Sequence, residues 1–216
     1  MILIKKHQTS YCKKILSFAI SNHVRYSDIS SSDKNIIKES LMQEQGHICA
    51  YCMSRIEDVE NVKLEHFIPQ SKVPGKALDY NNMLAVCNGN EGQPYEKQTC
   101  DSHKGDNIIK ADPTDPYVIS TIYYSKSGKI YSTDGDINSH LNNFLNLNCE
   151  DSYLVRSRKN AIETIQRQIY ECDRKGHSVK SLLKRLDKYY RSQADYKNPY
   201  IGIILWYIET KIKQNS

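Results

Sequence analysis

Apolar side chains recur at helical spacing in the first quarter of the chain. The stretch from Tyr11 to Ile20 has this spacing and predicts a short helix. A second helix is predicted to start at the N-cap residues Ser31, Ser32 or Asp33. It ends at residue 46, a glycine, because glycine readily adopts the left-handed conformation that closes a helix. Residues 1–46 therefore read as an N-terminal lead followed by a helix.

The same spacing returns in the C-terminal third. A long helix is predicted to open at residues 151–152 and to end before Gly176, and a basic helix follows over 178–191. Asn198 is the expected N-cap of a third helix, with Pro199 at its first position, where the missing N–H costs nothing. This part of the chain is predicted to be a group of packed helices.

Strand-like character is concentrated in residues 117–133. A break rich in Asp and Pro over 112–116 precedes this segment, and its β-branched and tyrosine residues predict a β-hairpin that turns at Ser127-Gly128. A short amphipathic segment over 138–147 follows it. The hairpin is thus expected to join the middle of the chain to the C-terminal helices.

Residues 47–106 have a different composition, dense in Cys, His, Asn, Gly and Pro. Such a segment buries little apolar area and needs an additional constraint to hold its shape. Cys49, Cys52, Cys87 and Cys100 all fall in it, and four thiolates are what a closed tetrahedral zinc site requires. A dithiol redox site at the first pair would need a βαβ pattern around it, which the sequence does not have. Structural zinc is the prediction, with residues 88–99 looped out between the last two ligands.

Length, charge and hydropathy exclude only a few classes of protein. The chain has 216 residues and 30 Lys and Arg against 25 Asp and Glu, so its net charge of +5 suits a polyanionic partner without requiring one. The longest apolar stretch, residues 201–208, is too short to cross a bilayer, and the N-terminus lacks the features of a signal peptide. A cytoplasmic location is expected, where seven cysteines do not indicate a disulfide framework.

Three further motifs lie between and after the cysteines. In chain order they are Glu65-His66 before Ile68-Pro69, Asn82 in the stretch Asn82-Met83-Leu84-Ala85-Val86-Cys87, and Cys100-Asp101-Ser102-His103-Lys104-Gly105. With the preceding Cys-x-x-Cys, this succession resembles the HNH (ββα-metal) nuclease family. The resemblance implies an α+β fold: a zinc-stapled ββα-metal module over 47–111, embedded in a mainly helical frame formed by 1–46 and 112–216, with an extra hairpin near 117–133.

The resemblance also assigns roles. His66 is similar to the family's general base, for which a neutral imidazole with a pKa near 7 is suited. Glu65, where the family more often has Asp, and His103 would bind the catalytic Mg²⁺ or Mn²⁺. The amide of Asn82 would bond to backbone near His66 and fix its loop, and Lys104 would contact phosphate or be solvated.

The overall layout resembles the HNH nuclease subunit of Septu-type anti-phage systems, which is also found with some retrons. This implies a defence effector that hydrolyses nucleic acid together with an ABC/SMC-like ATPase. The chain itself has no GxxxxGK[ST] motif. The alternative is a module without catalysis, which binds nucleic acid through its zinc fold or serves as a scaffold for the ATPase. DNA and RNA, including tRNA, both suit the expected chemistry.

Two C-terminal features have two interpretations each. The apolar run 201–208 is either a core helix or a docking helix for a partner. The basic helix 180–191 is either a solvated face or a contact with nucleic acid or a partner. The sequence leaves both questions open.

Overall fold

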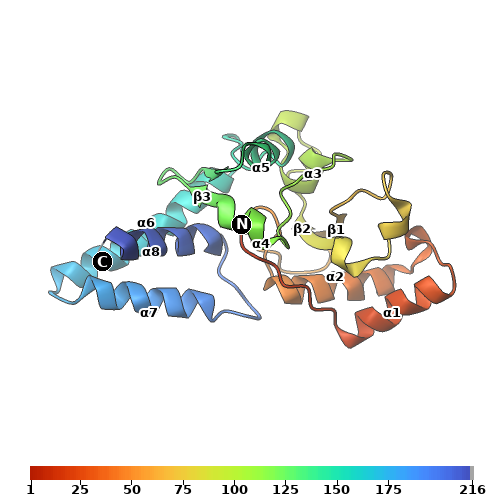
Figure 1. Ribbon diagram of the computed structural model, residues 1–216, viewed down its shortest axis with the longest axis horizontal. Helices are drawn as coiled ribbons and strands as arrows, with labels where there is room; N and C mark the ends of the chain where they lie inside the picture. The colour runs from red at the N-terminus through yellow and green to blue at the C-terminus, as the bar shows by residue number, and fades with distance from the viewer. Residues whose placement is uncertain (215–216) are drawn as a thin grey trace.

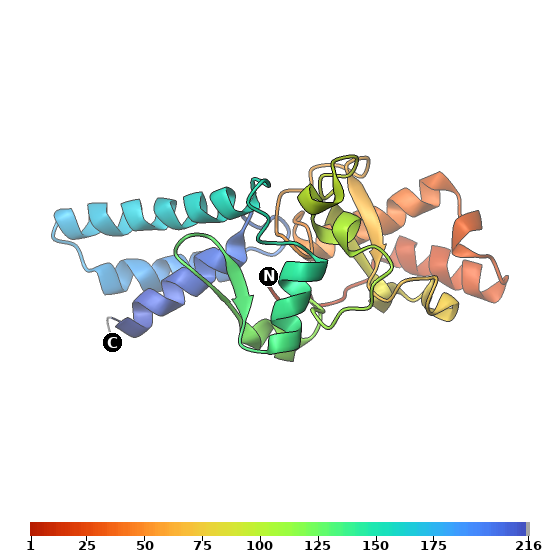
Figure 2. The same ribbon diagram turned by 90° about the horizontal axis from the view of Figure 1, so that it is seen from above.

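Two groups of helices lie at opposite ends of the molecule in the computed structural model, which describes residues 1–214 (Figure 1). One end is formed by α1 (Ser10–Ser21) and α2 (Ser31–Gln45). The other is formed by α6 (Leu154–Arg174), α7 (Val179–Arg191) and α8 (Ile201–Gln214). The strands and short helices lie between them, an arrangement that the view from above repeats (Figure 2). The final two residues of the predicted C-terminal region, 215–216, lie outside the described part.

The two N-terminal helices follow the sequence prediction closely. Thr9 caps α1 through its side chain, which accepts from the N–H of Cys12. Ser30 caps α2 by accepting from the N–H of Asp33, so the N-cap lies just before the predicted residues. The helix ends at Gly46, whose φ of 71° is the left-handed conformation expected there.

The central sheet consists of β1 (Val62–His66) and β2 (Met83–Cys87) in antiparallel register. Glu65 pairs with Leu84, and His66 pairs with Met83. Because neighbouring side chains on a strand point to opposite faces, Glu65 and His66 leave the sheet in different directions. The short helix α3 (Cys100–Lys104) contacts β2 and completes a ββα unit.

The predicted hairpin is present but shorter than expected. Its strands are β3 (Ile122–Tyr124) and β4 (Ile130–Ser132), joined by a turn that contains Gly128. Residues predicted as its first strand form the helix α4 (Pro116–Thr121) instead, because the Asp115 side chain caps its start and proline occupies its first position. Helix α5 (Gly135–Ser139) follows and continues into a π-helical turn over His140–Phe144.

Helices α6, α7 and α8 pack on one another through their apolar faces and form an arm of the molecule. Ser178 caps α7 as one of the predicted starting points. The prediction that Asn198 and Pro199 open the last helix is wrong. Tyr200 has a φ of 57°, which is incompatible with a helix, so α8 begins only at Ile201.

The start of α8 is fastened to the loop that follows α2. The N–H of Tyr200 donates to the carbonyl of Met53 at 2.9 Å, and the N–H of Lys197 donates to the carbonyl of Gly46 at 3.0 Å. One hydrophobic core cluster extends from Met1 to Ile208 and includes all regions of the chain. The α+β class with a mainly helical frame is confirmed. No helix among residues 1–214 is both long enough and apolar enough to span a bilayer.

Candidate active site and metal centre

The four predicted cysteines form one cluster. Their Sγ atoms all lie within 4.8 Å of one another. The Sγ–Sγ distance is 3.9 Å from Cys49 to Cys100, 3.7 Å from Cys52 to Cys87 and 3.8 Å from Cys87 to Cys100. Zinc–sulfur bonds of about 2.3 Å in a tetrahedron place the sulfurs about 3.8 Å apart. The donor set and its spacing therefore fit a structural zinc ion.

The backbone bends sharply on both sides of this cluster. Met53 and Cys100 have positive φ values of 63° and 54°. Gly89 also has a positive φ, 56°, and a Cβ built on it would lie 2.1 Å from the carbonyl oxygen of Thr99. This close approach closes the loop between the last two cysteines, because the N–H of Thr99 donates to the carbonyl of Gly89. The inserted residues 88–99 thus return the chain to the fourth ligand.

Burial makes the thiolate form of Cys49 unfavourable without a cation. Cys49 is fully buried, and its pKa is raised well above the usual range, first by desolvation. A zinc ion among the four sulfurs would reverse this preference by stabilising the thiolates. Metal binding at this centre is therefore expected to contribute directly to folding.

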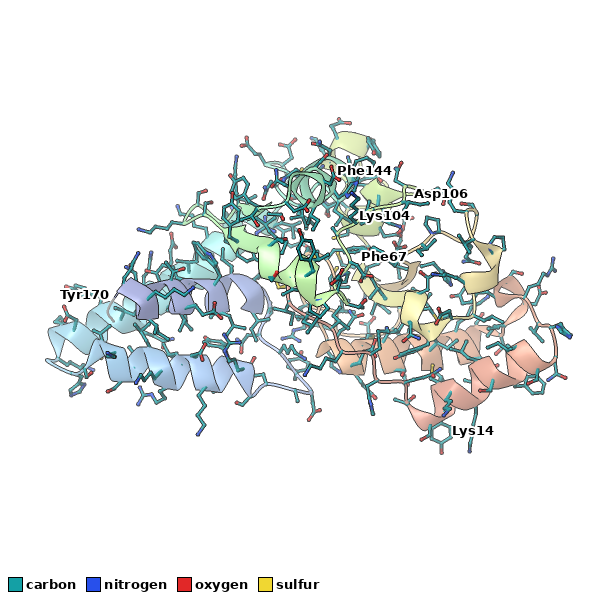
Figure 3. The ribbon with its side chains drawn as sticks, in the orientation of Figure 1. Lys14, Phe67, Lys104, Asp106, Phe144 and Tyr170 are labelled. Atoms are coloured by element: carbon teal, nitrogen blue, oxygen red, sulfur yellow. The ribbon has the colours of Figure 1, made fainter. Side chains whose placement is uncertain are left out.

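A cavity of about 480 Å³ lies beside the ββα unit. The residues around it that matter for the chemistry come from β1, from the loop after it and from α3 and its C-terminal end. They are Lys63, Glu65, His66, Gln70, Asp101, Lys104 and Asp106. Figure 3 shows Lys104 and Asp106 in the central part of the molecule, above Phe67 and away from the helical arm, which Tyr170 marks.

His66 is held in one orientation by two hydrogen bonds. Its Nε2 lies 2.9 Å from the carbonyl oxygen of Ala77, which can only accept, so this nitrogen carries the proton. Its Nδ1 then has the lone pair, which accepts from the side-chain amide nitrogen of Gln70 at 3.0 Å. Burial lowers the pKa of His66 below its usual value, which keeps the imidazole neutral. This is the tautomer and charge state of a general base that acts through Nδ1.

Asn82 fixes the chain just after His66. Its Oδ1 accepts from the N–H of Ile68 at 2.8 Å, and its Nδ2 donates to the carbonyl of Ile68 at 3.0 Å and to that of Lys76 at 3.3 Å. The backbone carbonyl of Asn82 also accepts from the N–H of Phe67. These contacts agree with the predicted role, an amide that holds the loop behind the histidine.

Glu65 lies in a nearly dry group of polar side chains. Its Oε1 accepts from the ammonium of Lys104 at 2.6 Å and from the hydroxyl of Tyr51 at 3.1 Å. Desolvation, with the Asp101 carboxyl next to it, raises the pKa of Glu65 to about 8, although Lys104 opposes this shift. Two carboxylates held this close repel each other, and a divalent cation between them would relieve that repulsion.

His103 is placed differently from the expectation that it shares an ion with Glu65. Its Nδ1 lies 2.9 Å from the carbonyl oxygen of Phe144, and its ring stacks on that of Tyr95 at 4.1 Å. It is not among the residues that line the cavity, whereas Asp101, two positions earlier on α3, is. The helix therefore turns His103 toward the π-helical turn and Asp101 toward Glu65. The structure therefore brings Asp101, rather than His103, next to Glu65.

The cavity carries more negative than positive charge. Its lining includes four carboxyl groups, those of Glu65, Glu91, Asp101 and Asp106. It includes two ammonium groups, those of Lys63 and Lys104. Lys63 is already paired, at 3.0 Å with Glu91 and at 3.7 Å with Asp101. A phosphodiester would be repelled from such a site unless a cation preceded it. The donor oxygens thus fit Mg²⁺ or Mn²⁺, which prefer carboxylates.

Across residues 1–214, the cysteine group is the one set of three or more potential ligands close enough to share an ion. The pair formed by Glu65 and Asp101 would therefore leave most of the coordination shell to water and phosphate oxygens, as Mg²⁺ favours.

Sequence reasoning missed three participants, each for a recognisable reason. Asp101 follows a zinc ligand directly, so its position was fixed by Cys100, but His103 was the more conspicuous residue type. Gln70 lies four residues after His66 in a loop whose path the sequence does not give. Tyr51 is inside the Cys-x-x-Cys knuckle, where a fully buried tyrosine next to a carboxylate could not be foreseen.

Comparison with known proteins agrees with this geometry. Residues 49–89 match the family model described as HNH endonuclease, a segment that includes three of the cysteines with Glu65, His66 and Asn82. The chain is 31% identical over 96 residues to "Retron Vc95 putative HNH endonuclease" from Vibrio cholerae serotype O1 biovar El Tor, covering 41% of this chain and 45% of that protein.

A second relative is "Septu protein PtuB" from Bacillus thuringiensis, 30% identical over 97 residues, which covers 44% of this chain and 37% of that protein. The matched part is less than half the length of either relative. The predicted resemblance to HNH nucleases of Septu and retron systems is confirmed at this level.

Proposed function

We propose that this chain, whose residues 49–89 form an HNH endonuclease domain, is a metal-dependent endonuclease that hydrolyses phosphodiester bonds of nucleic acid with His66 as its general base. The observation that carries the proposal is the state of His66. It is neutral and protonated on Nε2, and its Nδ1 lies at a cavity that also holds two adjacent carboxyl groups. A histidine that only filled space in the core would not need two adjacent carboxyl groups at a cavity beside it.

Proton transfer is the part of the reaction that the chain's own residues perform. Ala77 accepts from Nε2, and the Nδ1 lone pair, which here accepts from the Gln70 amide, would take the proton of an attacking water that replaces that amide. As the imidazolium forms, the carbonyl of Ala77, which accepts from Nε2, stabilises the new charge. Asn82 keeps the loop in position through both events.

Glu65 and Asp101 are proposed to hold the catalytic Mg²⁺ or Mn²⁺, which would polarise the phosphate and stabilise the leaving oxygen. Lys104 is completely buried and bonded to Glu65. We infer that its ammonium orients Glu65 and adds positive charge next to the scissile phosphate. The alternative that Lys104 is solvated is wrong, because its side chain is buried. The four cysteines would hold zinc and set the positions of β2 and α3.

The relatives suggest the biological setting. Their names belong to retron and Septu systems. On that basis we propose a cytoplasmic effector of anti-phage defence that acts with an ABC/SMC-like ATPase, the partner that the resemblance implies. Both DNA and RNA are candidate substrates of this chemistry.

The test is a cleavage assay on plasmid DNA, single-stranded DNA and tRNA, with the protein alone and together with the proteins encoded by its neighbouring genes. Cleavage should require Mg²⁺ or Mn²⁺ and stop on addition of EDTA. His66→Ala should lower the rate by about 10²–10⁴-fold, because a positioned base contributes that much. Its zinc content and melting temperature should stay close to those of the wild type. A variant that cuts normally would refute the role of His66.

The second candidate is a non-catalytic zinc module that binds nucleic acid or serves as a scaffold for the ATPase. It would account for the cysteine cluster but gives no reason for the Glu65–Asp101 pair beside a neutral histidine. Binding of nucleic acid or ATPase without cleavage of any substrate, with and without the partner, would favour this candidate.

A further inference from the structure

Positive charge is distributed very unevenly along the chain. Residues 151–216 contain 14 Lys and Arg against 7 Asp and Glu, a net charge of +7, whereas residues 1–150 contain 16 against 18, a net charge of −2. The part that carries the candidate active site is therefore slightly acidic, and the excess of basic residues belongs to the helical arm. A polyanionic substrate would be attracted by the arm rather than by the cavity.

The arm concentrates this charge on one side of α7. Lys180, Lys184 and Lys188 recur every four residues, so they lie on one face, about 6 Å apart along the helix axis. All three are exposed, as is Arg185 beside them. The buried side chains Leu182, Leu183 and Leu186 occupy the opposite face, which packs against α6 and α8. We call these four basic residues the α7 basic face.

The four residues of the α7 basic face have no carboxylate partner among residues 1–214. Three other basic side chains of the arm do have one, and two of these pairs lie on α6: Arg174 pairs with Glu171 at 2.9 Å, and Lys159 with Glu163 at 3.6 Å. Arg191, at the end of α7, pairs with Asp187 and with Glu209 of α8. Acidic residues thus neutralise the edges of the arm and leave the α7 basic face free.

We propose that the α7 basic face binds the sugar–phosphate backbone of the nucleic acid on which the HNH domain acts. The inference rests on the proposed function and adds a surface to it. Lysines are flexible point charges and contact phosphates without reading bases, so the binding is independent of base sequence. The arm holds the polyanion, and the acidic cavity then needs to accept only the one phosphate that its cation attracts.

Binding is measured with His66→Ala protein, so that no probe is cut, by fluorescence anisotropy of a labelled 30-nucleotide single strand, its duplex and a labelled tRNA. The triple variant Lys180→Gln, Lys184→Gln, Lys188→Gln should raise the Kd of at least one probe by about tenfold or more. It should also reduce the slope of log Kd against log salt by about 2–3, because each lost phosphate contact removes about 0.7–0.9.

The matched control removes three exposed lysines outside the arm, through Lys5→Gln, Lys13→Gln and Lys126→Gln. It changes the net charge equally and should leave the Kd and the salt slope within about twofold of the parent. An arm variant that binds all three probes like the parent overturns the proposal, as does an equal loss in the control. If the α7 basic face binds an acidic protein instead, the arm variant would bind all three probes like the parent.

The two proposals fail in different ways. If the wild-type protein binds the probes through the α7 basic face but cuts nothing under any metal condition, the nuclease assignment fails and the surface stands. If the wild type cuts its substrate and the arm variant cuts it with unchanged KM and kcat, the surface fails and the nuclease assignment stands.

Discussion

At the scale of single residues, the site depends on His66 being neutral and correctly protonated. The carbonyl of Ala77 selects the tautomer, and burial lowers the pKa. A cation held by Glu65 and Asp101 would lower that pKa further, since like charges disfavour the imidazolium. The base is thus ready near neutral pH, and its protonation limits the reaction only on the acid side.

This gives a prediction for the pH dependence of cleavage. The acid limb of the wild-type profile should have an apparent pKa below 6.5, the ordinary value of histidine. Gln70→Glu puts a carboxylate where the amide now meets Nδ1, which favours the imidazolium and should move the acid limb up by about one pH unit or more. Gln70→Leu, which removes the contact without adding charge, should move it far less. Identical acid limbs in wild type and Gln70→Glu would exclude this contact in the working enzyme.

A second prediction concerns the ligands of the catalytic ion. Asp101→Asn should weaken Mn²⁺ binding to the zinc-loaded protein by about tenfold or more, because one of two charged ligands is lost. His103→Gln should leave that affinity nearly unchanged, since its ring is stacked on Tyr95 and bonded to Phe144. Electron paramagnetic resonance of bound Mn²⁺ measures both. Strong weakening by His103→Gln alone would restore the Glu65–His103 pair.

At the scale of elements, close packing between a turn and a helix orders the region between the module and the arm. The turn of the β3–β4 hairpin lies against α6, where a Cβ on Gly128 would come within 2.2 Å of the carbonyl oxygen of Val155. The carbonyl of Gly128 also accepts from Nε of the buried Arg158 at 2.6 Å. The glycine therefore serves two needs, a φ of 91° and room for the helix backbone.

Gly128→Ala should lower the free energy of unfolding by about 2 kcal/mol or more, because the strained φ adds to the clash with backbone. Thermal melting followed by circular dichroism measures the change. Gly135→Ala is the control: its added methyl group meets nothing within 4 Å and its φ is not positive, so the melting temperature should stay the same or rise slightly. Equal melting temperatures for wild type and Gly128→Ala would contradict the packing described.

At the scale of the whole molecule, the cysteine cluster lies where the N-terminal helices and the arm are joined. Its knuckle lies between α2 and the start of α8, since Met53 accepts from Tyr200 and Gly46 accepts from Lys197. Arg55 adds a contact over the ring of Tyr196 at 3.8 Å. Loss of the ion is therefore expected to loosen the attachment of the arm as well as the nuclease site.

The purified protein should contain one zinc ion per chain, measured by inductively coupled plasma mass spectrometry. Cys52→Ala should lose most of it and lower the melting temperature, because metal binding free energy is folding free energy here. Hydrogen exchange of the Tyr200 amide should also become faster. Cys172 is a half-buried cysteine outside the cluster, so the Cys172→Ala variant should keep the zinc content and melting temperature of the wild type. Full zinc content in Cys52→Ala would rule out the four-cysteine centre.

The sequence by itself determined the chemistry that depends on spacing. The spacing of four cysteines is enough to predict that they cluster, and the resemblance that the motifs carry implies the ββα unit and an Asn82 amide bonded to backbone after His66. The helices were likewise predictable from apolar spacing and caps. Two predictions were exceptions. Part of the predicted first strand of the hairpin forms helix α4, and Asn198 does not cap α8, because Tyr200 has a positive φ.

Tertiary structure decided which side chains face one another. Asp101 and His103 both lie on α3. The orientation of this short helix places Asp101 near Glu65 and His103 near Phe144. Gln70 reaches His66 through a loop, and Asp187 on α7 pairs with Arg191 rather than with the α7 basic face. Spacing along a chain specifies ligands and periodic faces, but contacts between distant segments depend on how whole elements pack.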